Sequence, residues 1–492
     1  MTPLPVSFAA DPAAIDILST PEQFHDKQVN LASTACRRVH LAALYMGSEG
    51  KELELLTALE ANVARSPSLH VQCLFDHSRG CRGDVPSALH MHRLMQAGAV
   101  GAAASSTQPR VAAHFFKVPA LDVRPYSVFP PRFRETLGVQ HIKGYVFDDT
   151  VLISGANLSN DYFTDRQDRY WVFRDCPQLA DWMASLLRGV GEHSVPLRAG
   201  GAPNDDVSAL RKSLSPLSNP QGNASFVNMM QSHMQATQSD ASNESHACTR
   251  VYPSLQFLPA GIYQDSERTK NTMCADIADA HLYISTGYFN LTPEYRAALL
   301  GREGPVSLLT AAPVANGFTG ARGPAGAIPQ AYTEFLRMFL QQCVAAGQQE
   351  RITAWEYARP GWTFHSKGMW LQAGPRGSGS HSSKQHTGDG PLADVQAWIE
   401  AGSSAALSFI GSPNYGLRSV TRDIELQLGV ATRDQGLMQR MQHERRELFE
   451  APGVQQASVH SLQAVERRIQ ARWAWSNGAW IHAGWRLLGA YF

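Results

Sequence analysis

The chain has 492 residues, more than one ordinary core accommodates, so we expect two domains of about 200 residues with linking segments. Its 43 basic and 43 acidic side chains cancel, so no overall positive field exists to hold a polyanion, and nucleic acid is disfavoured as a partner. The seven cysteines include no C-x-x-C pair and the histidines no H-x-x-x-H spacing, which favours reduced thiols, no structural zinc and chemistry without a metal or other cofactor.

Two predicted strands and a helix open the first half. The segment RRVHLAALYM, residues 37–46, predicts a strand, and LHVQCLF, residues 69–75, predicts a second one. Between them, apolar residues from Leu56 to Val63 recur on one helical face, and Ser48 is the expected N-cap. Alternation of strands and helices indicates an α/β fold.

A glycine-rich and arginine-rich segment follows the second strand. It contains Arg79, Gly80, Arg82 and Gly83, a combination of guanidinium groups and accessible backbone amides that suits phosphate binding. The Gly-Lys-Ser/Thr ending of a P-loop is absent. A substrate-phosphate contact and an ordinary arginine-rich turn are equally good interpretations of this segment.

The segment HIKGYVFDDTVLISGAN begins at His141. Because alternate residues of a strand face the same side, His141 and Lys143 are expected to point into one pocket. Two apolar runs joined by a turn at Asp148 predict a hairpin that delivers Asn157 beside the histidine. Asp168 stands eleven residues past this asparagine. A single pair of this kind predicts little, because such residues are more often ordinary surface or core side chains.

The pattern recurs in the second half. HSKGMW supplies His365 and Lys367, GSPN supplies Asn414, and Glu425 follows eleven residues later. The preceding segments repeat as well: HLYISTGYF, a helix start Thr-Pro-Glu at 292–294, and VSLLTAA. The duplication indicates one site built from two related halves.

The duplicated residue types suit phosphodiester chemistry. One imidazole can attack phosphorus and form a covalent intermediate, while the other protonates the leaving oxygen and later deprotonates the incoming hydroxyl. Lysines and asparagines can hold the phosphate oxygens. A carboxylate bonded to the far ring nitrogen would fix the tautomer of each histidine.

Two segments divide the chain. The interval from His141 to His365 is 224 residues and that from Asn157 to Asn414 is 257, so the second hairpin contains an insert, expected as a flexible loop at about 374–404. A Ser-, Asn- and Gln-rich stretch predicts a polar linker. The expected domains are 1–199, the linker 200–250, and 251–492.

The runs HIKGYVFDDTVLISGANLSNDYFTDRQDRY and HSKGMWL, with SFIGSPNYGLRSVTRDIELQL, carry a resemblance to a known family. Two copies of His-x-Lys-x4-Asp with a glycine-serine-asparagine turn resemble the phospholipase D superfamily. The longer runs resemble the eukaryotic phosphatidylglycerophosphate synthase family, from about Arg37 to the C-terminus apart from two insertions. The resemblance implies two pseudo-twofold-related phospholipase D-like α/β/α sandwich halves with mixed sheets and an active site at their interface.

The resemblance also implies an activity and roles. The phosphatidyl group of CDP-diacylglycerol would pass to glycerol 3-phosphate with release of CMP, with His141 as nucleophile and His365 as acid. The carboxylates would pair across the halves, Glu425 with His141 and Asp168 with His365. The implied catalytic residues are His141, Lys143, Asp148, Asn157, Asp168, His365, Lys367, Asn414 and Glu425. Other phosphatidyl transfers, hydrolysis and a non-catalytic lipid-binding scaffold are the alternatives.

One position departs from the duplicated pattern. Gln372 stands where the second copy would repeat Asp148, an aspartate whose role in the superfamily is mainly structural. The resemblance implies that the synthase family lacks this aspartate in its second copy, so the site is expected to be intact. A degraded second half, as in a pseudoenzyme, is the competing interpretation.

Four arginines bracket the two acids and are expected to receive the phosphate of glycerol 3-phosphate. Salt bridges to Asp165 or Asp423 are the alternative. Together with the glycine-rich segment, the expected substrate contacts are Arg79, Gly80, Arg82, Gly83, Arg166, Arg169, Arg418 and Arg422.

Membrane contact is expected to be peripheral, since no stretch reaches the roughly 20 apolar residues that a spanning helix needs. The segment 471–492 concentrates tryptophans among arginines, as an interfacial segment would, although core packing explains it equally well. The first residues carry acids and no arginine and do not resemble a mitochondrial presequence. The resemblance nevertheless implies the mitochondrial inner membrane.

Overall fold

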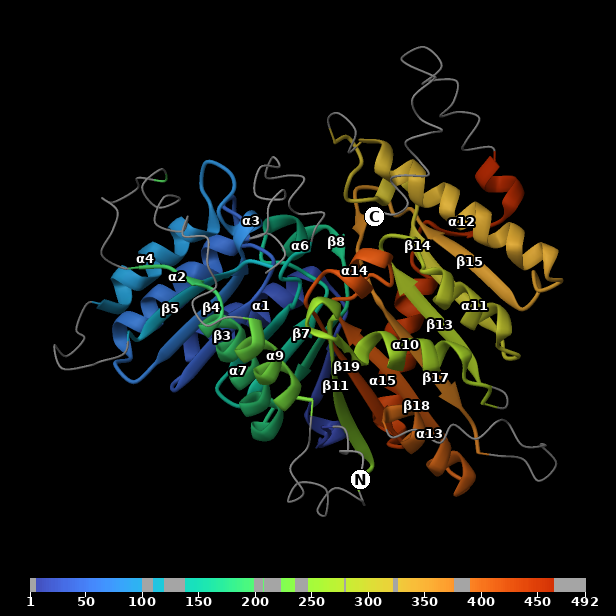
Figure 1. The fold of residues 1–492 in the computed structure, drawn as a ribbon, viewed down its shortest axis with the longest axis horizontal. Helices are drawn as coiled ribbons and strands as arrows, with labels where there is room; N and C mark the ends of the chain where they lie inside the picture. Colours follow the sequence, from blue (N-terminus) through green and yellow to red (C-terminus); the bar gives the residue numbers. More distant parts are fainter. Residues whose placement is uncertain are drawn as a thin grey trace, which may run out of the picture.

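The computed structural model describes residues 6–99, 109–118, 138–198, 207, 223–234, 247–277, 280–321, 326–375 and 390–463. Two mixed β-sheets, one from each half of the chain, lie side by side with helices packed on them (Figure 1). The expectation of two α/β/α halves with mixed sheets is confirmed.

The N-terminal sheet has eight strands, with the parallel trio β3, β4 and β5 beside the antiparallel strands β6, β7, β9 and β2. Its order is β10 (Val195–Pro196), β5 (Val111–Phe116), β4 (His70–Asp76), β3 (Arg38–Ala42), β6 (Gly144–Phe147), β7 (Thr150–Ser154), β9 (Tyr170–Phe173) and β2 (Ile15–Leu18). Helices α1 (Pro21–Thr34), α2 (Lys51–Arg65) and α4 (Ser87–Ala99) pack on one face, and α7 (Pro177–Glu192) and α9 (Asn223–Ser232) on the other.

The C-terminal sheet has ten strands and repeats this arrangement. Its order is β1 (Phe8–Ala9), β11 (Thr249–Phe257), β19 (Glu425–Thr432), β18 (Ala405–Gly411), β17 (Gly368–Ala373), β13 (His281–Thr286), β14 (Val306–Ala311), β15 (Ile352–Tyr357) and β20 (Val454–Ala457), and β12 (Ile262–Tyr263) pairs with β11. Helices α10 (Gln264–Cys274), α11 (Pro293–Gly301), α12 (Ile328–Ala345) and α13 (Pro391–Glu400) cover the outer face. Helix α15 (Gln435–Phe449) packs on the inner face.

One hydrophobic cluster belongs to both halves. It joins the inner faces of the two sheets through α7 and α15, with Met183 and Leu187 from the first and Leu437 and Met441 from the second. The two halves therefore share a core, which fixes how their strand ends meet.

The predicted elements appear close to their expected places. The hairpin after Lys143 is formed by β6 and β7, and the strands predicted at 37–46 and 69–75 are β3 and β4. Thr292 caps α11, accepting a hydrogen bond from the amide of Tyr295 at 3.3 Å. Ser48 as N-cap was wrong, because α2 begins two residues later, after Gly50.

The structure differs from the expected domain boundaries in three places. Strand β1 pairs with β11, so a segment of the expected N-terminal domain belongs to the C-terminal sheet. Helix α9 lies within the expected polar linker, and its Phe226 and Met230 are buried in the shared core. The expected flexible insert contains α13, whose Val395 is fully buried, because apolar residues at helical spacing follow Pro391. Residues 376–389 of this insert lie outside the described residues.

Candidate active site

Each motif histidine is positioned by backbone from the other half. His141 precedes β6, and its amide donates to the carbonyl of Ile424 at 2.9 Å. The amide of His365 donates to the carbonyl of Gln167 at 2.8 Å, beside the short parallel pairing of β8 (Arg166–Gln167) with β16 (Thr363–Phe364). The two motifs thus lie at the interface of the halves.

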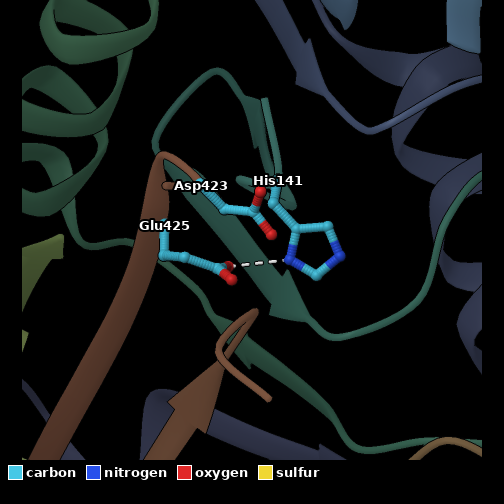
Figure 2. A group of neighbouring side chains, drawn as sticks. All are labelled: His141, Asp423 and Glu425. Atoms are coloured by element: carbon cyan, nitrogen blue, oxygen red, sulfur yellow. Dashed lines mark hydrogen bonds and ion pairs between the residues drawn. The ribbon is translucent and has the colours of Figure 1, made fainter. Parts of the chain in front are cut away.

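The carboxylates are exchanged between the halves. Nδ1 of His141 lies 2.8 Å from Oε2 of Glu425, and Nδ1 of His365 lies 2.7 Å from Oδ2 of Asp168. Figure 2 draws the first contact as a dashed line. Both carboxylates are buried. Because a carboxylate accepts the proton on Nδ1, each imidazole has Nε2 left for a reacting atom. The crosswise pairing implied by the resemblance is confirmed as geometry.

Burial sets the protonation of the two imidazoles and the two lysines. It lowers the pKa of both His141 and His365 well below its usual value, and the neighbouring lysines act in the same direction. Burial also lowers the pKa of Lys143 to about 7 and that of Lys367 to about 8, against the opposing carboxylates. Both imidazoles are therefore neutral and can accept a proton or act as nucleophiles.

The lysines lie beside the histidines of their own motif. Nζ of Lys143 donates to the carbonyl of His141 at 2.9 Å. Nζ of Lys367 lies 2.9 Å from Nε2 of His365 and 3.6 Å from Oδ2 of Asp168. Both ammonium groups are buried, so they supply positive charge where a phosphate oxygen would gain most from it.

The two asparagines differ in their contacts. Oδ1 of Asn157 accepts from the amide of Leu44 at 3.3 Å. Oδ1 of Asn414 is buried and has no hydrogen-bond partner among the described residues. Its backbone amide donates to the hydroxyl of Ser419 at 3.2 Å, and Ser419 in turn donates to Glu425. The second asparagine is therefore tied into the carboxylate that orients His141.

Asp423 joins the site, although sequence reasoning considered it only as a salt-bridge partner. It lies beside Glu425 and His141 (Figure 2). A carboxylate oxygen of Asp423, one of Glu425 and a ring nitrogen of His141 all lie within 4.8 Å of one another. Its carboxylate accepts from the amide of Val139 at 2.9 Å and from Nε of Arg418 at 2.9 Å. These protein donors already occupy the carboxylate and compensate its charge. The sequence signal for Asp423 was its spacing of two residues from Glu425, which places both acids on the same side of an extended strand.

Tyr162 is a second residue that sequence reasoning missed. It lies on α6 (Asn160–Thr164), five residues past Asn157, and its hydroxyl lies 3.3 Å from Nε2 of His365. The sequence signal for it was the tyrosine five residues past the motif asparagine in the run NLSNDYF.

Asp148 was expected among the catalytic residues, and the structure corrects this. It lies in the turn directly after β6, five residues from Lys143, or about 16 Å along an extended chain. Its carboxylate accepts from the amides of Cys36, Arg37 and Arg38 at 2.9, 2.8 and 3.0 Å. It therefore stabilises the turn into β3.

The corresponding position of the second half needs no such aspartate. Gln372 lies inside β17, which continues to Ala373, and it pairs with His281 of β13 and with Ala406 of β18. Asp148, by contrast, stands in a turn with φ of 51°. The replacement thus follows from a longer strand and leaves the catalytic end of the motif unchanged.

Arg169 was expected to bind substrate, and this is wrong. Its guanidinium is completely buried and pairs with Glu444 at 2.8 Å, with further hydrogen bonds to Ser408 and the carbonyl of Phe409. It also lies 3.8 Å over the ring of Trp370. This arginine therefore stabilises the contact between the two halves, and its buried guanidinium is not accessible to a ligand.

The remaining arginines border the site at different depths. Arg166 forms an ion pair with Asp161 at 2.7 Å and donates a hydrogen bond to Thr363. Its positive charge lowers the pKa of His365. Arg418 pairs with Asp423 and is partly exposed, as is Arg422. The expected salt bridge is thus present for Arg418, and for Arg166 the partner is Asp161 in place of Asp165.

The glycine-rich segment is partly helical. Arg79 and Gly80 belong to α3 (His77–Gly80), and the guanidinium of Arg79 lies 4.7 Å over the ring of Tyr45. Gly80 is buried where a Cβ would lie 2.7 Å from the ring of Phe115, so its role is close packing. Arg82 and Gly83 are exposed.

None of the helices in the described ranges has the length and apolar character needed to cross a bilayer.

Comparison with known proteins gives one consistent result, although no family model matches the chain. The chain is 34% identical to "CDP-diacylglycerol–glycerol-3-phosphate 3-phosphatidyltransferase, mitochondrial" of Bos taurus, covering 91% of this chain and 79% of the relative. It is 34% identical to the protein of that name from Homo sapiens, over 91% and 79%. It is 30% identical to a "Probable CDP-diacylglycerol–glycerol-3-phosphate 3-phosphatidyltransferase" of Dictyostelium discoideum, over 90% and 73%.

Among solved structures, the chain has the fold of a phosphatidylserine synthase from Haemophilus influenzae, with a TM-score of 0.69 and 19% identity over 99% of this chain and 97% of that one. With two fused halves, crosswise histidine–carboxylate pairs and relatives of this identity and coverage, the chain belongs to the CDP-diacylglycerol–glycerol-3-phosphate 3-phosphatidyltransferase family.

Proposed function

We propose that the protein transfers the phosphatidyl group of CDP-diacylglycerol to glycerol 3-phosphate and releases CMP, which makes it a phosphatidylglycerophosphate synthase in the supply of phosphatidylglycerol and cardiolipin. Family membership supports the substrates. The observation that carries the chemistry is the meeting of His141 and His365, each with its lysine and a carboxylate from the opposite half.

In the first half-reaction, Nε2 of His141 attacks the phosphatidyl phosphorus and forms a phosphorus–nitrogen bond. The bond from phosphorus to the CMP oxygen breaks, and His365 gives that oxygen the proton on Nε2. Since burial lowers the pKa of His365, the negative charge of the bound diphosphate is what raises this pKa enough for His365 to carry the proton.

The second half-reaction reverses these roles. His365, now neutral, removes the proton from the sn-1 hydroxyl of glycerol 3-phosphate as its oxygen attacks phosphorus, and the bond to His141 breaks. Lys143, Lys367 and the two asparagines hold the non-bridging oxygens in both steps. Glu425 stabilises the charge that His141 carries while it is phosphorylated.

The arginines at the rim supply binding energy for the phosphate of the acceptor. Arg166 and Arg418 are the best placed, because their charges reach His365 and His141 respectively. Arg79, Arg82 and Arg422 lie farther out and suit the nucleotide or lipid headgroups.

The lipid substrate requires membrane contact, which we propose is peripheral. The mitochondrial names of several relatives support a mitochondrial location. The inner membrane is the location that the family resemblance implies. The tryptophan-rich segment 471–492, expected as an interfacial contact, lies outside the described residues.

The test is an assay of the purified chain with CDP-diacylglycerol in detergent micelles containing EDTA. We expect CMP release that depends on glycerol 3-phosphate, with phosphatidylglycerophosphate as the lipid product. Serine, phosphatidylglycerol and water serve as alternative acceptors. Acceptor-independent release would indicate a hydrolase. No release, even with divalent metal restored, would leave a lipid-binding scaffold as the better account.

A further inference from the structure

The two halves of the site differ at one position where the duplication would make them equal. Five residues past each motif asparagine stand Tyr162 in the first copy and Ser419 in the second, on the short helices α6 and α14 (Leu417–Thr421). Ser419 donates to Glu425 on the Nδ1 side of His141. Tyr162 instead meets the opposite ring nitrogen of His365, the one that faces the reaction.

We propose that Tyr162 is a positioning residue whose hydroxyl donates a hydrogen bond to Nε2 of His365 and keeps that nitrogen unprotonated until a substrate oxygen takes its place. This rests on the proposed function for its role in turnover, but the contact itself does not. In the described part of the chain, Nε2 of His141 has no tyrosine in the corresponding position.

The geometry holds the hydroxyl in place. The ring of Tyr162 is buried and stands edge-on to the imidazole of His365, with centroids 5.0 Å apart and planes at 79°. The guanidinium of Arg166 lies 4.6 Å over the same ring, and Arg166 is itself held by Asp161. These two contacts hold the hydroxyl beside Nε2 until a substrate oxygen replaces it.

The direction of the hydrogen bond follows from the protonation states. Burial raises the pKa of Tyr162 well above its usual value, with Arg166 acting in the opposite direction, so the phenol is neutral and has a proton to donate. Asp168 accepts the proton on Nδ1 of His365, which leaves Nε2 as an acceptor. Lys367 also reaches this nitrogen, at 2.9 Å.

Several positive charges near His365 favour its neutral form. Lys367, Arg166 and Lys143 lower the pKa of His365, and the carboxylate of Asp168, 2.7 Å from Nδ1, opposes them. A hydrogen bond donated to neutral Nε2 acts with the cations, because it stabilises the unprotonated imidazole. Removing the hydroxyl should therefore raise the pKa of His365.

Tyr288 offers a matched control. Its ring makes the same edge contact with the imidazole of His365, at 5.5 Å and 79°, and its charge environment also includes Arg166. No hydrogen bond joins its hydroxyl to His365. Tyr162→Phe and Tyr288→Phe therefore remove the same atom beside the same ring, and only the first removes the contact to Nε2.

The experiment measures the protonation of His365 directly, on the full chain without substrate. Protein carrying 13Cε1-labelled histidine is titrated by NMR, and the His365 resonance is identified by its loss in His365→Asn. We expect Tyr162→Phe to raise the pKa of His365 by about half a unit to one unit, the size of one hydrogen bond. Tyr288→Phe should leave it unchanged. Equal values in wild type and Tyr162→Phe would overturn the proposal, whether or not the protein has the proposed activity.

A second measurement covers the case in which Tyr162→Phe fails to fold. Replacing Tyr162 by a ring-fluorinated tyrosine keeps the shape and makes the hydroxyl a stronger donor, so the pKa of His365 should fall. The pH profile of kcat/KM for CMP release, which reports the enzyme before substrate binds, should move to lower pH in the fluorinated protein and, where Tyr162→Phe folds, to higher pH in that variant. If neither substitution shifts the pKa of His365 or the pH profile of CMP release, the proposal is wrong and Tyr162 only packs against the imidazole. Wild-type protein without CMP release would instead count against the proposed function alone.

Discussion

Asp168 belongs to the N-terminal half and His365 to the C-terminal half, yet Oδ2 of the first lies 2.7 Å from Nδ1 of the second. Glu425 completes the exchange by bonding His141 at 2.8 Å. Each half therefore orients the imidazole of the other. Neither half by itself supplies both members of either motif pair, so the shared core that joins α7 to α15 is a condition for catalysis.

Asp168→Asn tests this exchange. The amide has a donor where the carboxylate had only acceptors, so it disfavours the tautomer with a proton on Nδ1, and we expect kcat for CMP release to fall by about 100-fold to 10,000-fold. Asp165→Asn is the control, since that side chain is exposed and, among the described residues, accepts a hydrogen bond only from Thr164. Comparable kcat values for the two variants would contradict the assigned role of Asp168.

The covalent step distinguishes the two histidines. With CDP-diacylglycerol labelled in its phosphatidyl phosphate and no acceptor, we expect label on the wild-type protein that survives base and is lost in acid. His141→Gln should trap none, and His365→Gln should accumulate label slowly, because attack remains possible but the leaving group is no longer protonated. Label retained in His141→Gln would assign the nucleophile to the other histidine.

The lysines make a pH prediction with a definite sign. Burial lowers the pKa of Lys143 to about 7 and of Lys367 to about 8, so their charged forms are present below these values and are lost as the pH rises through them. We expect kcat/KM, which reports the free enzyme, to decline on the alkaline side near these pKa values. Measurement of kcat/KM from pH 6 to 10 checks it, and a flat profile to pH 10 would refute it.

Asp148 is expected to stabilise the fold and not the transition state. Asp148→Ala leaves three backbone amides without their acceptor and places alanine at φ of 51°, which should cost about 2–3 kcal/mol of unfolding free energy. Below its melting temperature the variant should retain the kcat of the wild type. Gln372→Ala, at the corresponding position inside β17, should cost about 0.5 kcal/mol or less. Urea denaturation measures both.

Arg169 and Glu444 form a buried pair that joins the halves, and Glu444 also accepts from the indole groups of Trp171 and Trp370 at 2.9 and 2.8 Å. Arg169→Met leaves this carboxylate uncompensated, so we expect a loss of about 3–5 kcal/mol in unfolding free energy. Arg174→Met, which breaks the exposed pair with Asp16, should cost about 1 kcal/mol or less. A small effect of Arg169→Met in denaturant unfolding would show that the pair is dispensable.

Much of the architecture follows from local sequence. The β6–β7 hairpin, the cap at Thr292 and the repeated order of strand, helix and strand depend on residues within a few positions of one another, and periodicity and turn chemistry report such contacts directly. The predictions that were wrong also concerned local sequence. Ser48 is not the N-cap, because α2 begins after Gly50. The polar composition of 200–250 and 374–404 made the apolar faces of α9 and α13 hard to recognise.

The sequence by itself identified the repeated histidines, lysines, asparagines and acids, because their duplication is visible without a fold, but it did not identify Asp423 or Tyr162. Only the tertiary structure decided what each residue touches. Glu425 lies 284 residues from His141, and Tyr162 lies 203 from His365, and no local pattern encodes which distant side chains a shared core brings together. For the same reason Arg169 and Arg166, three residues apart, have different surroundings. Packing of the two halves buries Arg169 in the interface and leaves Arg166 near the imidazole of His365.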